Sequence, residues 1–139
     1  MILDRQTLMS NAQAITATAG STDQLDLSPR ATGVIRDIGA GNSIPLFIQV
    51  TETFNNLTSL TVSVQTDEDS AFGSPVTVLA TQAIPLASLV AGYKFLIDEV
   101  PRGSAERYIR ILYTVVGTAP TLGKITAGVN LGGVQTNNG

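Results

Sequence analysis

The sequence has no cysteine, no histidine and no tryptophan, and it contains few charged residues. Without cysteine the chain has no disulfide and no thiol nucleophile, and without histidine it lacks the commonest general base and zinc ligand. Charged residues make up 14% of the chain, against about 25% in an average domain. We therefore expect a protein that is not an enzyme, uses no cofactor or metal, and is stabilised by packing.

Positive charge and long apolar runs are also scarce. The net charge is -3 at pH 7 and the isoelectric point lies near 4.7, whereas binding a phosphate backbone needs a continuous field of Lys and Arg. No stretch is long and apolar enough to span a membrane, and the first residues lack the basic and apolar regions of a signal peptide. We expect no direct contact with nucleic acid or membrane, and synthesis in a cytoplasm.

Alternation of apolar with polar residues is what the sequence does contain. Residues 60–66 alternate one by one, and residues 124–131 nearly do, so each segment can bury one face as a β-strand. About eight such segments, separated by turns rich in Pro and Gly, predict an all-β protein with at most one short helical turn. An antiparallel β-sandwich fits this pattern, and a jelly roll is the favoured connection.

Local signals predict how some of the strands connect. Residues 76–80 return after an acidic turn and are expected to form a hairpin with 60–66. The one helical turn is expected near 84–92, with Gly92 as its C-terminal cap. The strand at 107–115 is predicted to pair antiparallel with the strand that begins at Ile125.

The N-terminal segment allows two interpretations. Residues 1–20 include the apolar Ile2 and Leu3 and show no clear helical period. They form either an arm whose apolar residues pack on a neighbouring protein or the first strand of the sandwich. Residues 21–139 are predicted to form a single β-sandwich domain, because the chain has the usual size of one domain.

Long runs without Asp, Glu, Lys or Arg distinguish this chain from an average free monomer. These runs span residues 6–22, 38–51, 53–66, 70–93 and 125–139. Their outward positions hold weakly hydrated side chains such as Thr, Ser, Asn and Gln, which favours extensive contact with another protein. Ordinary strand surface is the alternative interpretation, because exposed Thr is common in sheets.

The acidic run of Asp67, Glu68 and Asp69 is the first candidate interface. Adjacent carboxylates can bind a hard cation such as calcium, but the alternate acidic positions, central Gly and distal Glu of a calcium loop are missing. The remaining interpretations are a solvated hairpin tip, which is the default, and contact with a basic patch on a partner.

A cluster of basic and aromatic residues is the second candidate interface. Its members are Arg102, Arg107, Tyr108 and Arg110. Tyr108 and Arg110 are expected to project away from the core, and residues of these types often anchor interfaces. The alternative is an intramolecular ion pair, such as Arg107 with Glu106 or Glu99.

Four sets of residues in the same order give the chain a family likeness. They are NAQAIT at 11–16, LASLVAGYKF at 86–95, PRG at 101–103 with ERY at 106–108, and GKITAG at 123–128. Together they resemble the capsid cement, or decoration, proteins of tailed bacteriophages, the family typified by a Bordetella podovirus cement protein. The likeness covers nearly the whole chain and rests on the joint order of these segments, since none of them is a chemical motif.

The resemblance implies a dimeric jelly-roll protein of the virion, without catalytic residues. Such a protein binds the outside of an HK97-like shell of major capsid protein, bridges neighbouring capsomers and stabilises the shell against the pressure of the packaged genome. Two other functions stay open. A carbohydrate- or receptor-binding module predicts a groove lined by Tyr93, Tyr108 or Tyr113, and a structural domain of a tail or baseplate shares the virion setting.

Overall fold

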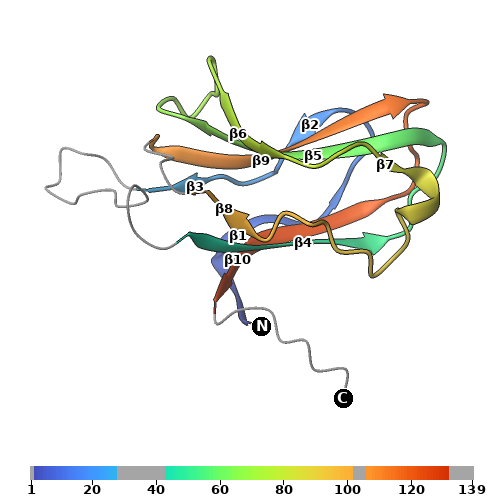
Figure 1. Cartoon of the computed structure of the whole chain (residues 1–139), viewed down its shortest axis with the longest axis horizontal. Coiled ribbons are helices and arrows are strands. Elements are labelled where there is room, and N and C mark those ends of the chain that lie inside the picture. Colours follow the sequence, from blue (N-terminus) through green and yellow to red (C-terminus); the bar gives the residue numbers. More distant parts are fainter. Residues whose placement is uncertain (1, 28–42, 102–105, 132–139) are drawn as a thin grey trace, which may run out of the picture.

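The chain folds into two antiparallel β-sheets packed face to face (Figure 1), as described by a computed structural model for residues 2–27, 43–101 and 106–131. The four-stranded sheet has the order β1 (Ile2–Ala14), β10 (Lys124–Leu131), β4 (Ile44–Glu52), β8 (Glu99–Val100). The six-stranded sheet has the order β2 (Ala19–Gly20), β9 (Tyr108–Gly117), β5 (Leu57–Asp67), β6 (Val76–Ala80), with β3 (Leu25–Asp26) also on β9 and β7 (Ile84–Pro85) also on β5. The predicted all-β sandwich is confirmed.

The strand pairing follows the path of a jelly roll. β1 pairs with β10, β2 and β3 pair with β9, β4 pairs with β8, and β5 pairs with β6, all antiparallel. The first half of the chain therefore runs back along the second half, as in one long hairpin that is then rolled into two sheets. The predicted hairpin between residues 60–66 and 76–80 is the closed end of this path, where β5 turns into β6.

The predicted pairing of residues 107–115 with the strand after Ile125 is wrong. The first segment forms β9, which pairs with β5, whereas the second forms β10, which lies in the other sheet between β1 and β4. The connection between them crosses from sheet to sheet. A short Gly-rich connection fits either a hairpin or such a crossing, so alternation alone did not distinguish them.

Alternating side chains of the long strands fill the space between the sheets. On β9 the odd-numbered residues Ile109, Ile111 and Tyr113 are fully buried, and Leu60, Val62 and Val64 of β5 meet them in the same core. The facing sheet contributes Leu46, Ile48 and Val50 from β4 and Ile125, Ala127 and Val129 from β10. Each fully buried aliphatic side chain of this kind stabilises the fold by about 2 kcal/mol before entropy is counted.

The N-terminal segment forms β1, an edge strand of the four-stranded sheet. Its register against β10 shifts at several points between Leu3 and Gln13. Met9 points into the core, and the hydroxyl of the neighbouring Ser10 lies 2.8 Å from the buried hydroxyl of Tyr113. Burial raises the pKa of Tyr113, and the hydrogen bond to Ser10 supplies a partner for a hydroxyl that water cannot reach.

The predicted helical turn is a short 3-10 turn over Leu86–Ser88. Pro85 precedes it, and Leu89 after it is fully buried. Gly92 does not cap this turn. It lies in the next one, where its φ of 95° lets the amide of Tyr93 donate to the carbonyl of Val90. Among the described residues, no helix is long and apolar enough to cross a bilayer.

The glycine just before β10 gives a stability test. Gly123 has a φ of 131°, and a methyl group there would overlap the ring of Phe54, whereas Gly92 has a φ of 95° with no atom within 4 Å of such a methyl group. Gly92→Ala is expected to cost about 1–2 kcal/mol from backbone strain alone. Gly123→Ala is expected to cost more, measured by urea unfolding of both variants. Equal losses would contradict the contact with Phe54.

Candidate protein-interaction surfaces

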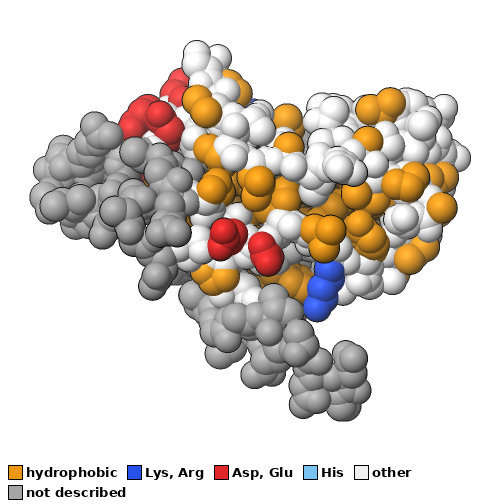
Figure 2. Space-filling model, viewed as in Figure 1, with side chains coloured by type: hydrophobic (Ala, Val, Ile, Leu, Met, Phe, Trp, Pro, Cys, Tyr) orange, Lys and Arg blue, Asp and Glu red, His pale blue; other side chains and the backbone are white. Residues whose placement is uncertain are grey.

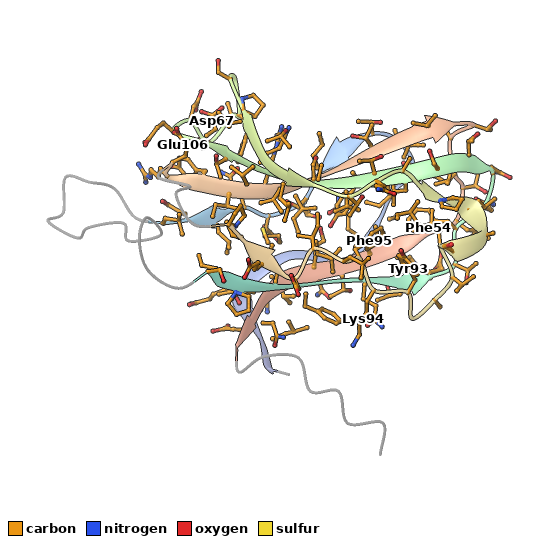
Figure 3. The ribbon with its side chains drawn as sticks, in the orientation of Figure 1. Phe54, Asp67, Tyr93, Lys94, Phe95 and Glu106 are labelled. Carbon is orange, nitrogen blue, oxygen red and sulfur yellow. The ribbon has the colours of Figure 1, made fainter. Side chains whose placement is uncertain are left out.

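Six of the nine candidate interface residues, Asp67, Glu68, Asp69, Arg107, Tyr108 and Arg110, gather at one end of the sandwich. Tyr108 at the start of β9 lies opposite Asp67 at the end of β5, and Arg110 lies opposite Gln65. Figure 3 shows Asp67 and Glu106 at this end, with Phe54 at the other. We call residues 25–27, 67–75 and 106–110 the charged end. Arg102 lies outside the described residues.

Arg107 is held by an acidic residue of another strand. Its Nε and a terminal nitrogen donate to the two carboxylate oxygens of Asp26, each at 2.9 Å, and its guanidinium lies 4.8 Å from the ring centre of Tyr108. The hydrogen bonds that Arg107 donates to Asp26 raise the pKa of Arg107. The intramolecular partner is therefore Asp26 and not Glu106 or Glu99, because the pairing of β3 with β9 places Asp26 opposite Tyr108.

Arg110 packs under the loop that joins β5 to β6. Its guanidinium lies 4.1 Å from the ring centre of Phe72, and its Nε donates to Oε1 of Gln65 at 3.0 Å. Burial lowers the pKa of Arg110, and the charge of Asp67 opposes that shift. Arg110 projects from the outer face of the sheet as expected, but the loop covers part of it, so that Arg110 is half-buried and Phe72 is only 7% exposed.

The acidic run organises the same loop. The carboxylate of Asp67 accepts hydrogen bonds from the amides of Asp69 and Ser74, both at 2.9 Å, and these bonds lower its pKa. The carboxylate of Asp69 accepts from the amide of Ala71 at 3.0 Å. Within the described ranges, no group of three or more His, Cys, Asp or Glu residues is arranged to hold a metal ion. Two of the three carboxylates therefore fold the loop that carries them.

The two apolar residues predicted for an N-terminal arm lie in β1. Ile2 is opposite Leu131 and Leu3 is opposite Asn130, so this part of the chain is paired within its own sheet. The side chain of Leu3 is half-buried. Asn130 beside it is fully buried, and its amide has no hydrogen-bond partner, which is a local cost to the fold.

In the part of the chain that the structure describes, the opposite end of the sandwich has no charged loop. Four loops meet there: residues 15–18, 53–56, 86–92 and 117–123, none of which contains Asp, Glu, Lys or Arg. We call these four loops the neutral end. At its base, Lys124 pairs with Glu52 at 2.6 Å, and this bond lowers the pKa of Glu52. At the right-hand end of Figure 2, beyond the blue basic side chain, the visible side chains are hydrophobic or uncharged polar.

Hydrogen bonds tie the loops of the neutral end to one another. The side-chain amide of Asn55 accepts from the backbone amides of Thr121 and Leu122 at 2.8 and 2.9 Å and donates to the hydroxyl of Thr121 at 2.8 Å. The amide of Phe54 donates to the carbonyl of Leu89 at 3.0 Å, and that of Ala91 to the hydroxyl of Thr53 at 3.0 Å. These loops therefore form one preorganised surface.

A third surface follows the edge of the four-stranded sheet. The segment 94–98 runs along β4, anchored by hydrogen bonds from the amide of Phe95 to Ile48 at 3.0 Å and from the amide of Leu46 to Asp98 at 2.7 Å. Between these anchors the side chain of Leu96 is 91% exposed. We call residues 94–98 the Leu96 edge, and Figure 2 shows hydrophobic side chains along this face between the two sheets.

Two apolar hollows flank Leu96. One, of about 260 Å³, is lined by Leu46, Phe47, Ile48 and residues 94–98. The other, of about 340 Å³, is lined by residues 79–82, Ile84, Leu96 and Ile97. An exposed leucine beside two hollows is a feature of protein contacts rather than of an isolated surface.

The tyrosines expected to line a carbohydrate groove are separated. Tyr113 is fully buried in the core, whereas Tyr108 lies beside Arg107 at the charged end. Tyr93 packs edge-on against Phe95, with ring centres 5.3 Å apart, next to the Leu96 edge (Figure 3). The structure therefore does not bring these residues into one groove.

Sequence reasoning missed both the neutral end and the Leu96 edge as sites. The charge-free runs were visible, but only the fold shows that their turns converge at one end. Leu96 follows Phe95 in an alternating segment, and no local signal distinguishes it from a half-buried strand residue.

Comparison with known proteins gives one result. The profile of the Bbp16 family matches residues 9–129, which is most of the chain. This match supports a Bordetella phage protein family, in agreement with that part of the resemblance. No curated protein matches the sequence.

Arg110→Glu separates an interface role from a structural one. The variant removes the contact with Phe72 and places a carboxylate beside Asp67, so we expect it to lose about 2 kcal/mol of stability. Hydrogen exchange of residues 68–75 is expected to increase more than that of β10. If stability and exchange stay unchanged, Arg110 does not hold the loop and returns to the interface candidates.

Proposed function

Because this chain belongs to the Bbp16 family, we propose that it is a capsid cement protein, a non-catalytic component of the virion. It binds the outside of the major capsid shell and bridges neighbouring capsomers. The observation that carries the proposal is a pair of surfaces on one sandwich: the charge-free, preorganised neutral end, and the Leu96 edge with its exposed leucine. Such surfaces suit adhesion to other proteins.

The physical effect of such a protein is thermodynamic linkage. A protein that binds the assembled shell and not its dispersed subunits lowers the free energy of the shell by RT ln(1 + [L]/Kd) at each site, about 2.7 kcal/mol at a concentration of 100 Kd. The contribution is repeated at every site on the shell. Contact with two capsomers adds an effective-concentration advantage, since one contact holds the protein in place when the other opens.

We also propose that two copies associate through the Leu96 edge. Lys94 and Asp98 lie at equal distances along the chain on either side of Leu96, and all three are exposed. A two-fold axis through Leu96 and perpendicular to the strand places Lys94 of each copy against Asp98 of the other, so the edge is self-complementary. Leu96 then faces the apolar hollows of its partner.

This arrangement has a consequence for bridging. A two-fold axis perpendicular to the strands reverses the strand direction between the two copies. The neutral ends of the pair therefore point in opposite directions. A dimer of this form presents two equivalent surfaces far apart, which is the geometry required to connect two neighbouring capsomers.

Binding to shells tests the cement proposal. Purified expanded capsids that lack this protein and carry no tails are expected to co-sediment with it and to disassemble at a higher temperature afterwards. If the capsids neither bind the protein nor gain heat resistance, the proposal is contradicted. Binding to isolated tails alone would instead favour a tail or baseplate protein, and glycan binding would favour a carbohydrate-binding module.

Charge exchange tests the dimer. Leu96→Asp and Lys94→Asp are each expected to weaken self-association more than about tenfold. The first buries a carboxylate in an apolar contact, and the second places a carboxylate opposite Asp98 of the other copy. The double variant Lys94→Asp with Asp98→Lys is expected to recover dimerisation, since the pairs are only reversed. Light scattering measures the mass of the protein in solution. Val76→Asp, at an exposed apolar residue away from the Leu96 edge, is the control. A monomeric wild type, or a dimer unaffected by Leu96→Asp, would contradict this contact.

A further inference from the structure

We infer that the neutral end is the surface that contacts the shell, and that the part of the shell it binds is an uncharged protein surface. The inference rests on the proposed cement function and goes beyond it by naming the contact surface and the chemistry of the partner. Three observations carry it: the distribution of charge along the sandwich, the distribution of exposed apolar side chains, and the rigidity of the loops.

Charge divides the two ends of the molecule. The four loops of the neutral end contain no charged residue, while Asp26, Asp67, Glu68, Asp69 and Arg107 all lie at the charged end. At the margin of the neutral end, Glu52 and Lys124 compensate each other. A shell surface with unpaired charges would lose hydration against these loops without gaining an ion pair. The complementary partner is therefore uncharged.

Exposed apolar side chains concentrate at the same end. Among the described residues, the large hydrophobic side chains with substantial exposure are Val76, Val90, Leu96, Val116 and Leu122. Val90 and Leu122 lie in the loops of the neutral end, 48% and 55% exposed, and Val116 lies next to Gly117 at its border. Leu96 belongs to the proposed dimer contact, and Val76 alone lies next to the charged end, at the start of β6. Apolar area is the main source of affinity for an uncharged partner.

The loops of the neutral end lose little entropy on binding. Asn55 joins the loop at 53–56 to the loop at 117–123, Thr53 holds the loop at 86–92, and the amide of Ile15 donates to the carbonyl of Gly123 at 3.1 Å. Ordering of flexible loops usually opposes association. Here the loops are already ordered by one another, so buried apolar area contributes to affinity with less opposition.

The affinity for the shell is expected to depend only weakly on salt concentration. Contacts between charged patches weaken as salt is added, because ions screen them. Binding through the neutral end is expected to change less than about threefold between physiological salt and about 1 M salt. The measurement is co-sedimentation of the wild-type protein with tail-free capsids across that range.

Paired substitutions locate the contact. Val90→Asp with Leu122→Asp is expected to weaken shell binding at least about tenfold, because two buried carboxylates would lack partners. Val76→Asp introduces a carboxylate at a valine of similar exposure, 52% against 48% for Val90, and is expected to bind like the wild type. Circular dichroism and light scattering check that each variant is folded and still dimeric.

The outcomes separate this inference from the function on which it rests. If the wild type does not bind shells, the cement function itself is wrong. If the wild type binds but the Val90 and Leu122 variant binds equally well, or if only Val76→Asp or added salt weakens binding, the contact lies away from the neutral end and the inference is overturned. Loss of binding by the double variant alone supports it.

Discussion

The packing of two sheets through alternate side chains is the constraint on which the rest of the molecule depends. The chain has no cysteine, so no disulfide holds the sheets together. Instead the odd-numbered residues of β9 and the even-numbered residues of β5 and β4 fill one core, and the Ser10 to Tyr113 hydrogen bond links the two sheets across it. The loops at both ends keep their conformations because the core packing fixes the strands that flank them.

The same packing explains how a charge-poor chain presents distinct surfaces. Strands that run the length of the sandwich place alternate loops at opposite ends, so residues distant in sequence become neighbours at each end. The neutral end collects four such loops, and the charged end collects the acidic turn and the start of β9 (Figure 1). A stiff frame between them suits a protein proposed to transmit load between capsomers.

Most charged residues at the charged end stabilise the chain itself. Arg107 engages Asp26, Arg110 lies against Phe72 and Gln65, and Asp67 accepts two backbone amides. Groups satisfied in this way have less to gain from a partner, because a new contact must replace an existing one. Conversely, Leu96, Val90 and Leu122 leave apolar area in water, which only another molecule can cover.

What the sequence determined by itself is the class of structure and the positions of its long strands. Residues 60–66 and 124–131 show the two-residue period of strands that bury apolar side chains, and residues 76–80 follow a turn as the return strand of a hairpin; each segment lies in a strand. The composition by itself also excludes a disulfide and a thiol nucleophile, because the chain has no cysteine. The tertiary structure alone decided that β9 and β10 lie in different sheets, that Arg107 meets Asp26, and that Leu96 protrudes. Local periodicity specifies which face of a strand is buried, but partners, loop convergence and exposure depend on contacts between residues far apart in the chain, which no local pattern encodes.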